Sequence, residues 1–350
     1  MEFKEWLMNE VDWEGEFSDV QKTCMNPEAL VEYLNAVRAN KDVAYGKRDK
    51  FGADMPFVHA KSKFFGGKDE VDVEDFAKRI TETPNTIINT NEKILKSGGP
   101  HEFVYKTGIP ALRGIVYDKS SGKFFVINTC PGAGTCVLIC YARRGKYIQY
   151  DEAYNSMTRR LNYLLNNPEE YEERMYAEIR DKCKMHGAKA GYKPKVIIRW
   201  NDSGDFFTKR YKTMAERVLA RLQRDGWNVD SYAYTKVADV ANDAEFQTTF
   251  SSGANSRQTA GVDFETHKLS MVVPKELFSD LDLMKIADDK ELKARIAKKF
   301  VLPVSDIITY GEMMSMPKGE VSKWHVIVTP GDGDDAAFRK DVKTILLTQH

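Results

Sequence analysis

Three cysteines, Cys130, Cys136 and Cys140, lie close together in a chain that contains five cysteines in all. A cluster of thiols in a chain of this length predicts metal or redox chemistry rather than a structural disulfide framework. Thiolates are soft ligands that suit zinc or iron–sulfur centres. Because structural zinc usually takes four protein ligands, three local cysteines favour a cluster with one iron open to a small molecule. We therefore predict that these three thiols bind a [4Fe-4S] cluster.

Two other interpretations of the same cysteines stay open on sequence alone. They could be ordinary small residues of a hydrophobic core, since free cysteine buries well. They could also be three ligands of a zinc site that Cys183, His186 or another distant residue completes.

Hydrophobic periodicity indicates which elements carry the cysteines. The strand predicted at 123–128 runs directly into Cys130, which places the cysteines at the carboxyl end of a predicted parallel sheet. Further strands are predicted at 103–105, 114–117, 196–200, 229–234, 245–250, 269–273 and 324–328. Helices are predicted at 27–39, after the cysteines, from Pro168 onward, between Tyr211 and Gly226, at 289–299 and at 334–347. This alternation predicts an α/β fold with a parallel sheet, either a partial (β/α) barrel or an open sheet.

Residues 1–100 are predicted to form an α-rich N-terminal appendage, and residues 101–350 an α/β catalytic domain. Within the appendage, basic residues at 38–68 are interleaved with Tyr45, Phe51, Phe57, Phe64 and Phe65. Such a mixture can bind single-stranded nucleic acid through charge and stacking. The alternative, which we favour, is that these aromatic side chains pack on the main domain.

Polar residues also follow the other predicted strands, at the sheet edge where ligands bind in α/β proteins. After 196–200, Gly204 lets a ligand approach the backbone and Asp205 offers a carboxylate to an ammonium or hydroxyl group. Lys236 can hold a carboxylate or phosphate, and Ser251 can donate to a ribose or phosphate. Each of these residues also has a purely structural alternative. A residue within 201–205 could be a helix N-cap, Lys236 could be a solvated surface lysine, and Ser251 could belong to a polar turn.

Arg199 lies inside the apolar strand at 196–200, where an unpaired charge is expensive. It therefore needs a partner, and we expect Asp202, Asp205 or a bound anion. The Gly-Asp-Gly-Asp-Asp sequence at 331–335 could hold a cation, but a turn with a helix N-cap explains it adequately.

The chain has 350 residues, of which 42% are hydrophobic, and its 52 basic side chains balance 52 acidic ones. This composition allows a sizeable core, and its overall charge predicts neither a polyanionic partner nor an acidic substrate. No apolar run approaches the roughly 20 residues that span a bilayer. The acidic, aromatic N-terminus lacks the apolar stretch of a secretory signal. We expect a cytoplasmic protein with reduced thiols and no membrane partner.

The order of these motifs resembles two groups of proteins. The cysteine loop ends in Cys-Tyr-Ala, and Arg-(x)3-Ser-Gly-Asp-Phe-Phe and Tyr-Thr-Lys follow it. This order is similar to a family of bacteriophage proteins named by the gene-product number eighty-eight, over roughly residues 120–255 and again at 334–342. More remotely, the layout resembles the radical S-adenosylmethionine (SAM) superfamily, whose three cysteines follow the first strand of a partial (β/α) barrel.

The radical SAM resemblance implies an iron–sulfur enzyme that cleaves SAM reductively to methionine and a 5′-deoxyadenosyl radical. By this resemblance the SAM-binding residues are Ser203, Gly204, Asp205, Lys236, Ser251 and Tyr141. The first three take the place of the motif that meets the SAM amino group. Lys236 suits the methionyl carboxylate and Ser251 the ribose. The implied partners are SAM and an electron donor such as flavodoxin or ferredoxin.

Three functions follow from these observations. The first is a phage-encoded radical SAM enzyme in the host cytoplasm. The basic stretches 38–68 and 182–195 suggest a nucleotide or nucleic acid as its substrate. The second is a zinc-stabilised, non-catalytic phage protein that binds nucleic acid or a host protein. The third, nuclease-like hydrolysis by Asp202 and Asp205 with a divalent metal, gives the three cysteines no purpose.

Overall fold

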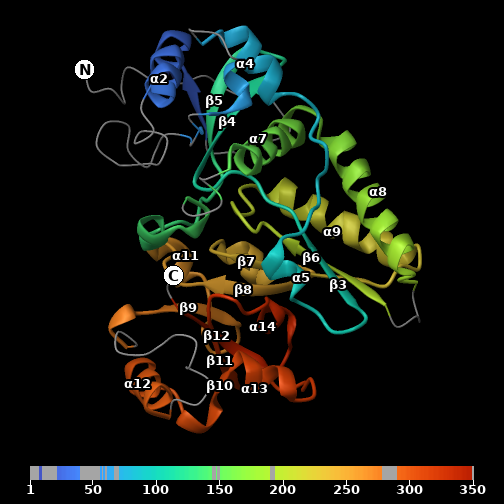
Figure 1. Cartoon of the computed structure of the whole chain (residues 1–350), viewed down its shortest axis with the longest axis vertical. Helices are drawn as coiled ribbons and strands as arrows, with labels where there is room; N and C mark the ends of the chain where they lie inside the picture. The colour runs from blue at the N-terminus through green and yellow to red at the C-terminus, as the bar shows by residue number, and fades with distance from the viewer. Residues whose placement is uncertain are drawn as a thin grey trace. The chain divides into compact units, whose positions relative to one another are not determined.

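The computed structural model describes residues 8–9, 22–39, 56, 58–59, 61–66, 71–143, 147, 150–189, 194–277 and 290–348 (Figure 1). The chain divides into two compact units. Unit 1 comprises Met1–Asn89, Thr107–Asp181 and Asn201–Asp225, and unit 2 comprises Thr90–Lys106, Lys182–Trp200 and Gly226–His350. The predicted boundary at residue 100 stays a prediction.

Unit 1 contains an antiparallel sheet. Its strands lie in the order β1 (Met8–Asn9), β2 (Lys22–Met25), β5 (Lys123–Asn128) and β4 (Arg113–Asp118). The strand predicted at 123–128 is therefore correct in its bounds, but it does not belong to the parallel sheet as predicted. A turn at 118–122 joins β4 to β5, and so short a connection permits only antiparallel pairing.

The helices α2 (Pro27–Ala39), η1 (Lys63–Phe65) and α4 (Val73–Ile80) share a hydrophobic core with this sheet, and α7 (Asp151–Asn166) is hydrogen-bonded to β4 through Asn162. Unit 1 also contains α8 (Pro168–His186, its last turn in unit 2) and α9 (Lys209–Arg224). The helix predicted at 27–39 is confirmed, and α8 begins at Pro168 as predicted. Phe64 and Phe65 belong to one hydrophobic cluster with Phe124 and Val126 of the sheet, so they pack on the main domain as their structural interpretation predicted. Tyr45, Phe51 and Phe57 lie outside the described residues.

Unit 2 is built on an eight-stranded parallel sheet, which confirms the predicted α/β class. Its strands lie in the order β10 (Ile307–Thr309), β11 (Trp324–Val328), β12 (Val342–Thr348), β9 (Leu269–Val273), β8 (Gln247–Ser251), β7 (Val229–Thr235), β6 (Lys195–Trp200) and β3 (Glu102–Lys106). Central strands such as β6 are buried on both faces, which explains their continuous apolar sequences.

The helices of unit 2 are short, and they flank this sheet (Figure 1). They are α5 (Glu92–Leu95), α10 (Ala238–Asp243), α11 (Ser256–Ala260), α12 (Lys290–Phe300) and α13 (Tyr310–Ser315), with α14 (Asp335–Phe338). Besides η1, the described residues include the short 3-10 helices η2 (Thr135–Ile139) and η3 (Tyr141–Arg143) in unit 1, and η4 (Lys275–Leu277) and η6 (Val304–Asp306) in unit 2.

The helix predicted at 334–347 is wrong. The helix α14 stops at Phe338, and the chain continues as β12 between β9 and β11. The spacing of the apolar residues in this segment fits both the helical period and the alternation of a strand. Val342, Thr344 and Ile345 are β-branched, however, and favour a strand. Among the described residues, no helix has the length and apolar character needed to cross a membrane.

Candidate functional site

The three clustered cysteines occupy an accessible segment of unit 1. Cys130 comes two residues after β5, Cys136 lies in η2, and Cys140 separates η2 from η3. All three are partly exposed, and η2 contributes no buried residue. The two remaining cysteines, Cys24 and Cys183, are buried instead. The interpretation of the cluster as ordinary core residues is therefore wrong.

Cys130 is held firmly by its neighbours. The backbone N–H of Leu112 donates to its Sγ at 3.3 Å, and its own N–H donates to Asn128 Oδ1 at 3.2 Å. Leu112 has a φ of 64°, in the left-handed region that non-glycine residues rarely adopt. Backbone strain of this kind often marks functional sites, and here it accompanies an N–H group aimed at sulfur. Such hydrogen bonds tune the properties of iron–sulfur centres.

The three thiols do not converge as a metal site requires. In the part of the chain that the structure describes, no three or more His, Cys, Asp or Glu side chains are grouped so that they could hold a metal ion. Cys130, Cys136 and Cys140 all belong to that part. Their donor chemistry suits a soft metal centre, but as placed here they do not form a single ligand set.

The turn Asn201–Asp205 follows β6 and, in contrast to the cysteine segment, is a buried polar segment of unit 1. Asn201, Asp202, Ser203 and Asp205 are each no more than 5% exposed. Gly204 has a φ of 76°, and a Cβ on it would lie 2.4 Å from Ile109 Cγ1, so only glycine fits here. None of these residues caps the next helix, as the structural alternative proposed, because the N-cap of α9 is Thr208. The polarity of this turn therefore needs another explanation.

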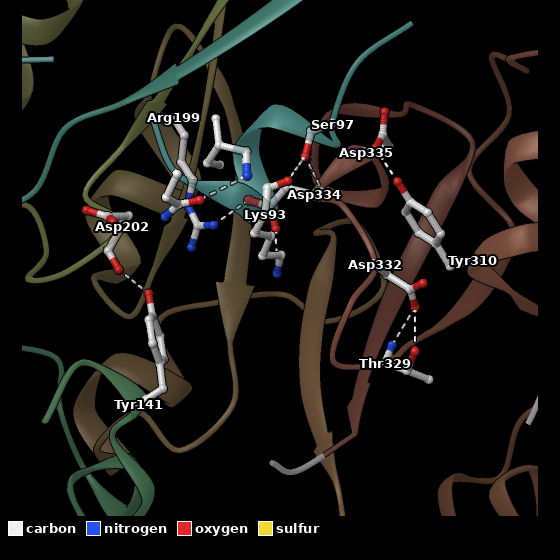
Figure 2. A network of polar contacts seen from close by, with 12 residues as sticks. Lys93, Ser97, Tyr141, Arg199, Asp202, Tyr310, Thr329, Asp332, Asp334 and Asp335 are labelled. Carbon is white, nitrogen blue, oxygen red and sulfur yellow. Dashed lines mark hydrogen bonds and ion pairs between the residues drawn. The ribbon is translucent and has the colours of Figure 1, made fainter. Parts of the chain in front are cut away.

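The structure brings the cysteine segment and the Asn201–Asp205 turn together within unit 1. The N–H of Asp205 donates to the carbonyl of Thr129, the residue before Cys130, at 2.9 Å. Tyr141, the residue after Cys140, donates its hydroxyl to the backbone carbonyl of Asp202 (Figure 2). Both ends of the cysteine segment thus contact one turn.

Tyr147, which the sequence analysis did not identify, also connects the chain after the cysteines to the Asn201–Asp205 turn. The hydroxyl of Tyr147 donates to Asp202 Oδ2 at 2.7 Å, and the rings of Tyr141 and Tyr147 pack edge to face at 5.8 Å. Gly108 packs closely against Asp202, because a Cβ at this position would come within 2.1 Å of Asp202 Oδ1. The carbonyl of Gly108 accepts from the buried Arg160 at 3.2 Å. Burial lowers the pKa of this guanidinium, and Asp202 is among the charges that oppose the shift.

Lys236 and Ser251 belong to unit 2. Lys236 is the first residue after β7 and is partly exposed. Ser251 is the last residue of β8, is 8% exposed, and accepts a hydrogen bond from the hydroxyl of Ser270 at 3.1 Å. Both residues therefore lie at carboxyl ends of parallel strands, as predicted.

Unit 2 also contains a charged network centred on Asp334 (Figure 2). Asp334 Oδ2 accepts from Arg199 Nη1 at 2.5 Å and from the hydroxyl of Tyr232 at 2.8 Å, and its Oδ1 lies 3.0 Å from Lys93 Nζ. Burial alone would raise the pKa of Asp334, but Arg199 and Lys93 outweigh burial and lower it to about 2. Arg199 thus has the partner that its position required, an aspartate 135 residues away in sequence, while the expected pairing with Asp202, Asp205 or an anion stays a prediction.

The aspartates next to Asp334 have separate partners. Asp335 accepts from the Gly98 N–H at 2.8 Å and from the Tyr310 hydroxyl, and burial raises its pKa. Asp332 accepts the N–H and the hydroxyl of Thr329 at 2.7 and 2.9 Å. The 331–335 sequence is therefore a turn that leads into α14, as its structural interpretation predicted. Asp334 occupies the N-cap position but makes no side-chain capping hydrogen bond.

The fold and the site define a mixed α/β protein with a parallel sheet and a separate, cysteine-bearing segment docked on a buried turn. The chain belongs to the Gene product 88 family, whose model matches residues 85–325. This match confirms the predicted phage gene-product family and contains the whole of the predicted stretch at 120–255, but it does not reach the one at 334–342. Neither a curated protein nor a solved structure matches the chain.

Proposed function

We propose that this protein is an iron–sulfur enzyme of the radical SAM type, acting in the cytoplasm of the phage host. One observation carries the proposal. Three partly exposed thiols occupy a segment whose two ends contact the Asn201–Asp205 turn. A segment that served only packing would bury its small apolar and sulfur-bearing side chains. This segment instead exposes its thiols while its flanking backbone is fixed.

Strand order supports the proposal. The strands β3, β6, β7, β8 and β9 are neighbours in the same order as in the chain, as in a (β/α) barrel. In the sequence, the three cysteines fall between β3 and β6, and the Asn201–Asp205 turn follows β6. A cysteine segment after the first parallel strand and a polar turn after the second is the layout that the radical SAM resemblance implies.

Each residue in the proposed site has a distinct task. A cluster on Cys130, Cys136 and Cys140 would supply the electron that cleaves SAM. Asp205 would accept from the SAM amino group, and its carboxylate is already oriented because Oδ1 accepts the Phe206 N–H at 2.8 Å. Ser203 and Gly204 would line the approach of this group.

The remaining proposed SAM contacts come from three other residues. Lys236 would pair with the methionyl carboxylate and Ser251 would bind the ribose. Tyr141 would face the adenine, since its hydroxyl is already anchored and half of its surface is exposed. A flavodoxin- or ferredoxin-like donor would reduce the cluster, and a nucleotide or nucleic acid would be the substrate.

Anaerobic reconstitution with iron and sulfide tests the proposal. We expect a brown protein that absorbs near roughly 400 nm and holds iron and sulfide in near-equal amounts. Cys136→Ala should abolish loading, whereas Cys24→Ala should not, because Cys24 is buried in β2. Asp205→Asn should leave the iron content unchanged and weaken SAM binding in calorimetry. A colourless protein with one tightly held zinc would refute the proposal and support the non-catalytic alternative.

A further inference from the structure

Unit 1 contains a cluster of buried polar side chains that the proposed SAM contacts do not use. Its members are Thr107, Arg160 of α7, Tyr171 of α8 and Asn201, and each is no more than 4% exposed. In each of them one side-chain donor has no hydrogen-bond partner among the described residues: Thr107 Oγ1, Arg160 Nη2, Tyr171 OH and Asn201 Nδ2. Buried polar groups nearly always have a partner, so several such donors in one cluster indicate that they share a ligand.

These donors lie around the phenol of Tyr171. Burial raises the pKa of Tyr171 to about 12, and the nearby charge of Arg160 is the largest influence that opposes this shift. The hydroxyls of Thr107 and Tyr211 also oppose it, so they lie beside the phenol, although neither is in hydrogen-bond geometry with it. The hydroxyl of Tyr211 donates instead to Asn201 Oδ1 at 3.0 Å, which brings the amide group of Asn201 to the same place.

Arg160 gives this cluster a positive charge without a close counter-charge. Its Nε donates to the carbonyl of Thr86 at 3.0 Å and its Nη1 to that of Gly108 at 3.2 Å. Both carbonyls are neutral, and Arg160 forms no ion pair with any residue that the structure describes. Burial lowers the pKa of the guanidinium, and Asp202 and Glu178 are among the groups that oppose this shift from beyond ion-pair distance. A buried charge without a partner is costly, so this one requires an anion close by.

We infer that Thr107, Arg160, Tyr171 and Asn201 form a buried binding site for a small inorganic anion of about the size of chloride. Two hydroxyls, an amide and a guanidinium supply donors that such an ion accepts. The ion also neutralises Arg160, which a water molecule would not do, and the burial of all four side chains restricts the ligand to a small ion. It would link α7 and α8 to Asn201, whose φ of 52° lies in the left-handed region, and so stabilise the turn that begins there.

Thermal unfolding of the full chain tests the site, with sodium chloride or bromide replacing sodium gluconate at constant ionic strength. A ligand that binds only the folded protein should raise Tm by at least about 2 °C, along a single-site binding curve. Arg160→Met should abolish this rise. Tyr171→Phe should raise the apparent Kd for chloride at least about tenfold, because a hydrogen bond to a charged group is lost.

The matched control is Tyr176→Phe on the same helix. Its hydroxyl donates to Asp225 Oδ2 at 2.5 Å, so its loss should leave the apparent Kd for chloride unchanged. A wild-type Tm that is the same in chloride and gluconate would overturn the inference and indicate that the cluster holds water only. An equal chloride response in wild type and Tyr171→Phe would place the ion elsewhere and overturn it as well.

Tyr171→Phe keeps the inference testable if Arg160→Met does not fold, because it removes one oxygen and retains the buried ring. The site is independent of the proposed function, since these measurements use neither iron nor SAM. A failed iron reconstitution would therefore leave the chloride result unaffected.

Discussion

Replacing Asp334 with asparagine removes the carboxylate that binds Arg199 and Lys93 in unit 2, with little change of shape. Asparagine imitates a permanently protonated aspartate. The free energy of unfolding should therefore fall by the energy that lowers the pKa of Asp334 from 3.8 to about 2. At about 1.4 kcal/mol for each pH unit, this shift corresponds to a loss on the order of 2 kcal/mol at pH 7. Truncation to alanine should cost more, about 3–5 kcal/mol, because it leaves Arg199 without this counter-charge in a buried site.

The pH dependence of the loss has a definite sign. The pKa of Asp334 is lower in the folded protein than in the unfolded chain, so its contribution is complete above pH 3.8 and disappears as the pH falls toward 2. The difference in unfolding free energy between wild type and Asp334→Asn should therefore shrink at pH 3 to about half of its value at pH 7.

Urea unfolding at pH 7, 5 and 3 measures this difference. The matched control is Asp332→Asn in the same turn, whose carboxylate is bound by Thr329 and which should cost on the order of 1 kcal/mol. A double-mutant cycle with Arg199→Met then isolates the pair from general damage to the turn. The reasoning fails if Asp334→Asn is no more destabilising than Asp332→Asn at pH 7, or if its cost is the same at pH 3.

Two further predictions concern single sites. Gly108→Ala should destabilise unit 1 by at least about 2 kcal/mol in urea unfolding, because its Cβ would come within 2.1 Å of Asp202 Oδ1. Gly311→Ala, in the helix α13 with open space around it, is the control, and an equal loss there would contradict this explanation. Burial lowers the pKa of Lys268 from 10.5 to about 7. Stability should therefore rise between pH 7 and 10.5, where the unfolded chain binds the extra proton, and Lys268→Met should abolish that rise. Parallel pH profiles for the two proteins would disprove the assignment.

Local sequence determined the bounds of several helices and strands in both units. The apolar spacing in 27–39 and the strands at 123–128, 269–273 and 324–328 match the structure in their bounds. These segments carry a clear period or a short apolar run between turn residues, and such signals depend only on near neighbours. The cysteine spacing likewise identified the segment that the structure leaves accessible.

Sheet membership could not be predicted in the same way. The strand β5 pairs with β4 and β2 rather than with the parallel sheet, and β12 lies in the sheet where a helix was predicted. An apolar period shows that a segment is buried on a given face, but it does not identify the neighbour that buries it. The fold adopts the packing that buries all apolar faces together, and that packing determines the neighbour of each strand.

The sequence by itself determined that three thiols lie close along the chain and that a polar turn follows the strand β6. Only the tertiary structure decided that Asp202 receives Tyr141 and Tyr147, and that Asp334 neutralises Arg199. These pairs are separated by 55 to 135 residues in sequence, so no local period encodes them. They form because burial removes water from a charged or polar group, which must then find its partner wherever the fold places one.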